Sequence, residues 1–289
     1  MSAPENFAVF ILSHGRADRV STYYSLRKCG YTGPIWILVD NEDEQAERYE
    51  ANYPGAVIVF DKAEAAKITD AADNSGKRNS VVFARNINWQ IAREKGLTHF
   101  WQLDDDYQSF GWTVDNRGRY CSSDPFTGRL DDILKACLRF LDDSSASSVA
   151  FVQGGDLVGG AESSFVYKAA RGGISRKVMN TFLFRVDRPV PFLGRMNDDV
   201  NMFIVNGNRG NLFVTIPRLR VWQKQTQSSE GGLTEMYRES GTYAKSFYTV
   251  MYAPHCVSIN AIGTKHKRLH HKIRWNGAVP KIISEDYKK

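Results

Sequence analysis

Three consecutive aspartates, Asp104, Asp105 and Asp106, directly follow a run of large apolar residues in the sequence THFWQLDDD. Adjacent carboxylates repel one another, so such a group stays in water, shifts its pKa values or binds a divalent cation. Alternate side chains of an extended segment point to the same side, which lets Asp104 and Asp106 converge while Asp105 points elsewhere. The triplet is therefore either a metal site of the DxD type or a solvated acidic turn.

The DxD arrangement favours one kind of chemistry, the binding of a nucleotide sugar. A hard cation such as Mg²⁺ or Mn²⁺ on one or two carboxylates keeps positions for diphosphate oxygens and neutralises a phosphate leaving group. The segment SGKRNSVVFARN, ahead of the apolar run, adds the cations Lys77, Arg78 and Arg85. A helix that presents Arg85 and Asn86 beside the carboxylates would hold a phosphate or a ribose, and solvated helical charge is the alternative.

Apolar runs that alternate with helical segments must position these side chains. Strands are predicted within residues 7–12, 33–40, 55–61 and 98–106, and helices within residues 16–31, 41–55 and 75–97. This alternation predicts a doubly wound α/β sheet that binds ligands at the carboxyl ends of its strands. The side chains expected to converge there are Ser13, His14, Gly15, Arg16, Asp40 and the triplet.

Beyond residue 110 the alternation weakens. We predict a hairpin within residues 111–122, an amphipathic helix within 128–148, and strands within 149–160 and 180–186. No linker divides the chain, so a single folded unit over residues 1–289 is expected.

Composition limits the class of protein. With 289 residues, 42% of them hydrophobic and 12% aromatic, the chain can bury a large core. No apolar run reaches the roughly 18 to 20 residues of a membrane span, and the N-terminal segment lacks the pattern of a signal peptide, so we expect a cytoplasmic protein. The four cysteines show no CxxC spacing, which predicts free thiols rather than a zinc site or disulfides.

The positive charge is concentrated in two segments. The formal net charge is +6 and the pI is near 9.0, which favours a polyanionic partner, although a solvated basic surface is the alternative. The cations of interest are Lys168, Arg171, Arg176 and Lys177 around a Gly-Gly turn, and Lys265, Lys267 and Arg268 near the C-terminus. Asn180, Phe182 and Phe184 follow the first segment, and we expect them to face the same partner, with a flexible loop that leads to an apolar strand as the equal alternative.

Several stretches together resemble a known enzyme family. ILSHGR, WILVD, FARN, WQLDDD and GRMNDDVNMF, with the ending RLHHKIRWNGAVPKI, look like a GT-A glycosyltransferase. More specifically, they are similar to the bacteriophage TET-associated glycosyltransferases, relatives of the base J glucosyltransferase that glycosylate hydroxymethylated pyrimidines in DNA. The resemblance implies a Rossmann-like GT-A domain over residues 1–289 with a central, mostly parallel sheet. Residues 1–110 would bind the nucleotide sugar and residues 111–289 the acceptor.

The resemblance also implies roles for individual residues in donor and metal binding. Donor contacts are assigned to Ser13, Arg16, Asp40, Arg85, Asp104 and Asp105. Within this set, Asp40 would contact the base and Arg85 the ribose or diphosphate. The metal would be held by Asp104 and Asp106 together with a late histidine. The candidates are His255, His266, His270 and His271, of which His270 or His271 fits the resemblance best, although a histidine in such a segment is also an ordinary surface or core residue.

The catalytic base is expected in the sequence Asn197-Asp198-Asp199, which matches the xED element of the family with aspartate in place of glutamate. The resemblance favours Asp199 as the base, with Asp198 as the second candidate. Without the family resemblance, residues 195–203 are predicted to form a loop that enters a helix. An aspartate at such a position is either an N-cap of the helix or a catalytic base.

The resulting expectation is an inverting, metal-dependent glycosyltransferase that moves glucose from UDP-glucose to 5-hydroxymethylcytosine or 5-hydroxymethyluracil in DNA. Mn²⁺ or Mg²⁺ would be the cofactor, and the two basic segments would contact the phosphates of DNA from which the target base is extruded. Two alternatives remain open at this stage. One is a GT-A enzyme with a protein or glycan acceptor, and the other is a non-catalytic DNA-binding module.

Overall fold

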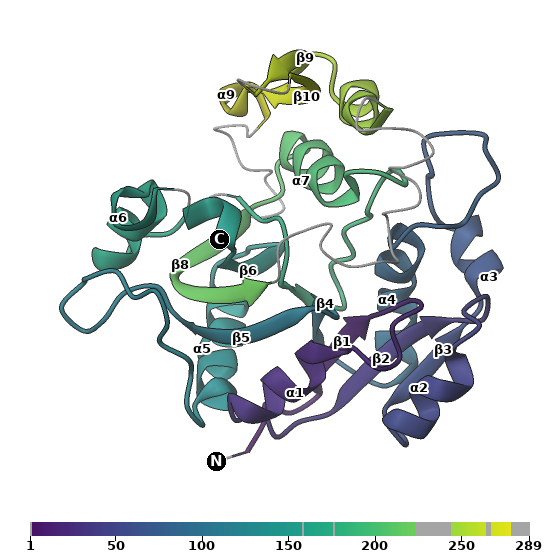
Figure 1. Ribbon diagram of the computed structural model, residues 1–289, viewed down its shortest axis with the longest axis horizontal. Coiled ribbons are helices and arrows are strands. Elements are labelled where there is room, and N and C mark those ends of the chain that lie inside the picture. Colours follow the sequence, from purple (N-terminus) through teal and green to yellow (C-terminus); the bar gives the residue numbers. More distant parts are fainter. Residues whose placement is uncertain (1, 158, 176, 224–243, 264–266, 279–289) are drawn as a thin grey trace.

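Four parallel strands form the N-terminal half of a central sheet in the computed structural model, shown in Figure 1. β1 (Phe7–Leu12) pairs with β2 (Ile35–Asp40) and with β4 (His99–Asp104), and β2 pairs with β3 (Val57–Phe60). Because these pairings are parallel, the carboxyl ends of the strands lie at one edge of the sheet. The structure describes residues 2–157, 159–175, 177–223, 244–263 and 267–278.

The other half of the sheet is mixed. β7 (Phe182–Arg185) is antiparallel to β4 and to β6 (Ser148–Val152), while β8 (Phe213–Gln223) is parallel to β6 and antiparallel to β5 (Tyr107–Trp112). The strand order is β3-β2-β1-β4-β7-β6-β8-β5. Parallel pairings still outnumber antiparallel ones, which confirms the predicted α/β class with a mostly parallel central sheet.

The sheet curls back on itself beside the aspartate triplet. Only Asp105 and Asp106 separate the end of β4 from the start of β5, although β7, β6 and β8 lie between these two strands in the sheet. Three Cα–Cα steps span at most roughly 11 Å. The outer strand β5 must therefore return to the carboxyl end of β4, and the triplet lies where the two strands meet.

Helices cover both faces of the sheet. They are α1 (Ser21–Lys28), α2 (Ala46–Asn52), α3 (Lys62–Lys67), α4 (Val82–Glu94), α5 (Leu130–Asp143), α6 (Ser164–Ala170), α7 (Asp198–Asn208) and α9 (Trp275–Ala278), with 3-10 turns at Gly154–Leu157 and Gly160–Glu162. Side chains of α1, α2 and α5 belong to one apolar cluster, and those of α3, α4 and α7 belong to a second.

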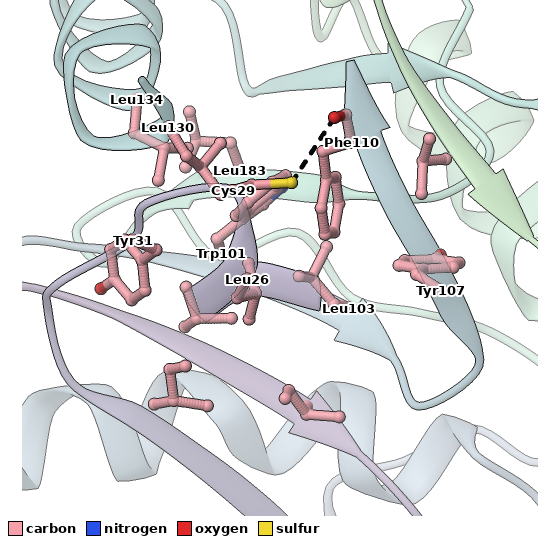
Figure 2. Packing of buried hydrophobic residues seen from close by; sticks show 14 of the residues in the cluster. Leu26, Cys29, Tyr31, Trp101, Leu103, Tyr107, Phe110, Leu130, Leu134 and Leu183 are labelled. Atoms are coloured by element: carbon pink, nitrogen blue, oxygen red, sulfur yellow. Dashed lines mark hydrogen bonds between the residues drawn. The ribbon is translucent and has the colours of Figure 1, made fainter. Parts of the chain in front are cut away.

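Strand β1 contributes to both apolar clusters, as the two-residue period of a strand requires. Phe7, Val9 and Ile11 lie in the first cluster, and Ala8, Phe10 and Leu12 lie in the second. Figure 2 shows part of the first cluster, where the Cys29 thiol donates a hydrogen bond to the carbonyl oxygen of Phe110 across 3.6 Å. All four cysteines are free, as predicted.

The helix predicted within residues 75–97 begins later than expected. α4 starts at Val82, so Lys77 and Arg78 lie in the preceding loop rather than on a helix. Gly76 has a φ of 68°, which is left-handed and incompatible with an α-helix. The Asp73 carboxylate also accepts the backbone N–H of Ser75, a local turn that competes with helix formation.

The C-terminal part adds a small second sheet. β9 (Val257–Ile262) and β10 (Arg268–Ile273) pair in antiparallel fashion, and a helix over residues 244–252 precedes them. Val257 and Ala278 join the same apolar cluster as α7, and Figure 1 shows α7 between this small sheet and the central one. Among the described residues, no helix has both the length and the apolar character needed to cross a membrane.

Candidate active site

The three aspartates after β4 have different surroundings. Asp105 is 3% exposed, and its carboxylate accepts hydrogen bonds from Ser13 Oγ at 2.6 Å and Arg16 Nη1 at 2.9 Å. Asp104 and Asp106 are partly exposed. Because Ser13 and Arg16 both follow β1, the loop after β1 holds Asp105 and leaves Asp104 and Asp106 as the accessible members of the triplet.

Helix α1 fixes the backbone of the triplet. Thr22 Oγ1 donates to the carbonyl oxygen of Asp104 at 2.6 Å and accepts the backbone N–H of Tyr107 at 2.9 Å. The Thr22 backbone N–H donates to the carbonyl oxygen of Asp105 at 3.2 Å. The sequence reasoning missed Thr22, because one threonine in a helix gives no signal until its partners are placed.

The negative charge of the triplet is only partly compensated. Burial, together with the charges of Asp104 and Asp105, raises the pKa of Asp106 to about 6. Gln223, at the end of β8, donates from Nε2 to the two carboxylate oxygens of Asp106 at 3.1 and 3.3 Å. Burial also raises the pKa of Asp105, against the opposing charge of Arg16.

A second polar group lies at the carboxyl ends of β1 and β2. Asp40 is 4% exposed and contacts His14 Nδ1 at 2.8 Å and Lys62 Nζ at 3.1 Å. Burial alone would raise the pKa of Asp40, but the hydrogen bond from His14 and the charges of His14 and Lys62 bring it below its usual value. The same hydrogen bond raises the pKa of His14.

A pocket opens beside this group. It has a volume of about 390 Å³ and is lined by His14, Glu42, Lys62, Lys77, Arg78 and Asn79. Arg78 is paired with Glu42 through Nε at 2.7 Å, and Lys62 is paired with Asp40. The lining carries more cationic than anionic side chains, which suits an anionic ligand such as a phosphate. Asp40 lies behind His14 and Lys62.

The start of α7 brings two further carboxylates, those of Asp198 and Asp199, close to the triplet. Arg85 of α4 lies 3.3 Å from Asp104 (Nη2 to Oδ1) and 2.8 Å from Asp198 (Nε to Oδ2). The shorter contact is an ion pair without hydrogen-bond geometry. Burial raises the pKa of Asp198 against the opposing charge of Arg85, and burial likewise raises the pKa of Asp199, which is half-buried.

Asn197 orients the start of α7. Its backbone is left-handed, with φ 54° and ψ 33°, a conformation that asparagine tolerates better than most residues. Its side-chain Nδ2 donates to the carbonyl oxygen of Lys245 and to Thr249 Oγ1, both at 3.0 Å, and lies 3.3 Å from His271 Nδ1. The helix over residues 244–252 and β10 therefore both support the N-terminus of α7.

The late histidines lie on β10, beside Asn197 rather than in a described contact with the triplet. The rings of His270 and His271 lie with their centroids 4.3 Å apart and their planes tilted by 36°. Burial and the nearby charges of His270 and Lys245 lower the pKa of His271 to about 4, so its ring is neutral at pH 7. Metal ligation by either histidine remains a prediction.

The charge at this site fits a divalent cation. Five carboxylates face two guanidinium groups here: Asp104, Asp105, Asp106, Asp198 and Asp199 against Arg16 and Arg85. Asp104 and Asp106 offer hard oxygen ligands, and ions such as Mg²⁺ commonly bind one or two carboxylates and complete their shell with water and phosphate oxygens. In the described part of the chain, no three His, Cys, Asp or Glu side chains are arranged to hold a metal by themselves.

An arginine that the sequence reasoning missed secures the loop before α4. Arg195 is 6% exposed and donates from Nη2 to Asp73 Oδ2 at 2.7 Å and from Nη1 to Asn79 Oδ1 at 2.9 Å. Tyr248 also donates to the Asp73 carboxylate. The loop that lines the pocket is thus joined to the segment that enters α7 and to the helix over residues 244–252.

The predicted DNA-contacting residues are distributed over two surfaces. Arg171 is exposed, and its guanidinium lies 3.7 Å from the ring centroid of Tyr167, which is 61% exposed. Lys168 contacts Ser175 Oγ at 3.4 Å, and Lys177 pairs with Asp156 at 2.7 Å. Lys267 is exposed immediately before β10, in which Arg268 is the first residue. Arg176 and Lys265 lie outside the described residues.

The expectation that Phe182 and Phe184 face the partner is wrong. Both side chains are fully buried, with nearly parallel rings whose centroids are 5.6 Å apart. They belong to β7, a strand inside the sheet, where an apolar aromatic pattern serves the core. Asn180 is also buried, and its amide nitrogen donates to Gln153 at 2.7 Å.

Comparison with solved structures finds distant similarity. No curated protein sequence matches the chain. S. aureus TarS 1–349 aligns with 12% identity and a TM-score of 0.44 over 88% of this chain and 66% of that one. The mannosyltransferase PcManGT from Pyrobaculum calidifontis, in complex with GDP-Man and Mn²⁺, aligns with 12% identity and a TM-score of 0.44. The alignment covers 88% of this chain and 76% of that one. GalNAc-T7 with UDP, GalNAc and Mn²⁺ aligns with 12% identity and a TM-score of 0.42, over 86% of this chain and 50% of that one. This chain therefore spans only part of the length of each of the three proteins.

The family of the chain follows from its sequence. The sequence model of the TET-associated glycosyltransferase family matches residues 7–232 of the 289. This range runs from β1 to just beyond β8 and includes the aspartate triplet, Arg85 and the start of α7. The match covers well over half of the chain and confirms the resemblance of its motifs. The chain belongs to the TET-associated glycosyltransferase family.

Proposed function

We propose that the protein transfers glucose from UDP-glucose to the hydroxymethyl group of 5-hydroxymethylcytosine or 5-hydroxymethyluracil in DNA. One observation carries this proposal. The Arg85 guanidinium lies between two clusters of carboxylates, the triplet after β4 and the aspartates at the start of α7. A metal-dependent glycosyltransferase requires both clusters. Family membership supports the DNA acceptor.

The donor would bind at the carboxyl ends of β1, β2 and β4. The pocket beside His14 and Lys62 offers cationic side chains for a nucleotide, and the partly exposed Asp104 carboxylate lies 3.3 Å from Arg85. Ser13 and Arg16 support the site through their hydrogen bonds to Asp105. Mn²⁺ or Mg²⁺ held by Asp104 and Asp106 would supply the positive charge that offsets a departing diphosphate.

Asp199 would act as the general base. Its carboxylate is half-buried at the first turn of α7, and Asp198 beside it is paired with Arg85. The base takes the proton of the hydroxymethyl group as that oxygen attacks the anomeric carbon of the sugar. The bond from the anomeric carbon to the diphosphate breaks on the opposite side, so the configuration at this carbon inverts.

The DNA would approach from the side of residues 111–289, and residues 1–110 would form the donor half. Arg171 stacked on Tyr167, together with Lys168 and Lys267, provides cationic and aromatic groups for phosphates and an extruded base. The remaining proposed contacts are Lys177, Arg268 and, outside the described residues, Arg176 and Lys265. The place of action would be the cytoplasm, that of the host cell if a phage encodes the protein.

Donor turnover with defined DNA tests the proposal. Purified protein with Mn²⁺ would be given a panel of nucleotide sugars and DNA that contains 5-hydroxymethylcytosine, 5-hydroxymethyluracil or neither, with nucleotide release and nucleoside mass as readouts. We expect a gain of one hexose on one modified base, abolished in Asp106→Ala. Nucleotide release without a change in DNA would indicate a protein or glycan acceptor. No turnover and no Mn²⁺ binding would indicate a non-catalytic module.

A further inference from the structure

Arg85 joins two segments that lie far apart in the sequence. Its Nη2 lies 3.3 Å from Asp104 Oδ1 at the end of β4, and its Nε lies 2.8 Å from Asp198 Oδ2 at the start of α7. The guanidinium is planar and rigid, so it keeps the two carboxylates that contact it close to each other. Donor-side and acceptor-side carboxylates therefore share one counter-ion.

The surroundings of Arg85 leave little room for a ligand on its guanidinium. The Arg85 side chain is 8% exposed, and the rings of Phe182 and Phe192 lie 5.3 and 5.1 Å from its Cζ atom. Aromatic rings at these distances attract a cation and exclude water from it. A group enclosed in this way acts on its protein partners rather than on a substrate phosphate.

The pairing also distinguishes the two aspartates of α7. Asp198 is 5% exposed on its side chain and is the one that pairs with Arg85 among the described ion pairs. Asp199 is half-buried, and its Oδ1 accepts the backbone N–H of Val200 at 2.8 Å. Asp198 thus faces Arg85, and Asp199, as the next residue of the same helical turn, points in a different direction.

We propose that Arg85 is a positioning residue: through its ion pairs with Asp104 and Asp198 it places the base Asp199 against the donor, and it contacts neither substrate. This inference rests on the proposed glycosyl transfer and changes the role expected for Arg85, which the sequence assigned to the ribose or diphosphate. A misplacement of about 1 Å in a catalytic group can cost on the order of 100-fold in rate, so the arrangement matters without any ligand contact.

Steady-state kinetics with Arg85→Lys and with a double-mutant cycle tests the inference. Lysine keeps the charge but loses the planar fork, so we expect kcat to fall at least about tenfold while the donor KM changes by less than about threefold. Calorimetric binding of UDP with Mn²⁺ should be unchanged. The control is Arg185→Lys, which alters an arginine that also bridges two aspartates, Asp142 and Asp187, and should keep wild-type kcat and KM.

The cycle combines Arg85→Met with Asp198→Asn. If Arg85 acts through Asp198, the double variant should lose no more than about threefold in kcat beyond Asp198→Asn alone. Asp198→Asn keeps the side-chain shape and remains informative if Arg85→Met alone does not fold. Losses that multiply, a donor KM raised tenfold or more in Arg85→Lys, or wild-type kcat in that variant would each overturn the positioning role. Absence of transfer by the wild-type protein would instead refute the proposed function itself.

Discussion

An arginine that bridges two aspartates lies beside each end of β4, but the two arginines have opposite surroundings. At the carboxyl end, Arg85 is 8% exposed between Asp104 and Asp198. At the amino end, Arg185 of β7 lies opposite His99 and pairs with Asp142 and Asp187 at 2.8 Å each, with these aspartates 44% and 61% exposed. The residue types are alike, and the difference is access to water.

Burial decides what such a bridge can do. Exposed ion pairs contribute about 0–1 kcal/mol, because water and salt screen both charges. A buried charge that loses its partner costs about 3–5 kcal/mol of folding free energy. Folding therefore strongly favours the arrangement in which the two charges stay in contact. The bridge at the carboxyl end is therefore suited to hold reactive groups in place, whereas the bridge at the amino end fastens a surface.

The largest expected contrast between the two ends is in catalysis. Asp199→Asn removes the proposed base and should lower the rate of sugar transfer by about 10²–10⁴-fold. Asp142→Asn at the other end of β4 should leave the rate unchanged. Initial rates under donor saturation measure both, with circular dichroism as the check on folding. A rate for Asp199→Asn within tenfold of the wild-type rate would mean that another group, with Asp198 as the nearest candidate, removes the proton.

The next contrast is in the free energy of unfolding. Arg85→Met leaves Asp198 buried without its partner and should lower stability by about 3–5 kcal/mol. Arg185→Met breaks an exposed bridge and should cost about 0–1 kcal/mol. Urea titration at pH 7.5 measures both values. Equal losses for the two variants would show that burial does not separate the two bridges and would remove the basis of the comparison.

The smallest contrast is in the direction in which the free energy of unfolding changes with pH. The pKa of Asp106 is raised to about 6 by burial and neighbouring carboxylates, so its stabilising contribution is complete below the unfolded pKa of about 4 and is lost as pH rises through about 6. The pKa of Asp187 is lowered by the Arg185 hydrogen bond, so its contribution is present above about 4 and is lost as pH falls.

Urea titrations of metal-free protein between pH 4.5 and 7.5 check this sign. We expect the free energy of unfolding of the wild-type protein to fall by about 1–2 kcal/mol as pH rises across this range, with the partial exposure of Asp106 taken into account. Asp106→Asn should remove this decline. Asp187→Asn should leave that decline in place. If wild type and Asp106→Asn show parallel profiles, the Asp106 carboxyl does not titrate in this range.

The sequence was a good guide where structure is local. Continuous apolar runs such as Phe7–Leu12 and Ile35–Asp40 are typical of buried parallel strands, and both strands lie where the pattern placed them. The order β7-β6-β8-β5 could not be predicted, because those pairings join segments far apart in the chain. For the same reason the sequence suggested a ligand for Arg85 and gave no sign that Asp198 is its partner.

Aromatic residues show a further limit. Phe182 and Phe184 follow a basic segment, and their composition fitted a base-binding surface as well as it fitted a core strand. Only the position of β7 between β4 and β6 decides between these readings. Asp105 illustrates the converse: its neighbours in sequence are acidic, while the partners that hold it, Ser13 and Arg16, come from the loop after β1.

The return of β5 to the end of β4 gives the triplet a mechanical role. The strands β4, β7, β6, β8 and β5 form a chain of pairings whose first and last members are joined covalently through Asp105 and Asp106. A closed circuit of this kind has little slack, because no strand can shift without pulling on the residues that close it. The triplet should therefore open only together with the sheet, as one cooperative unit, rather than as a loose surface turn.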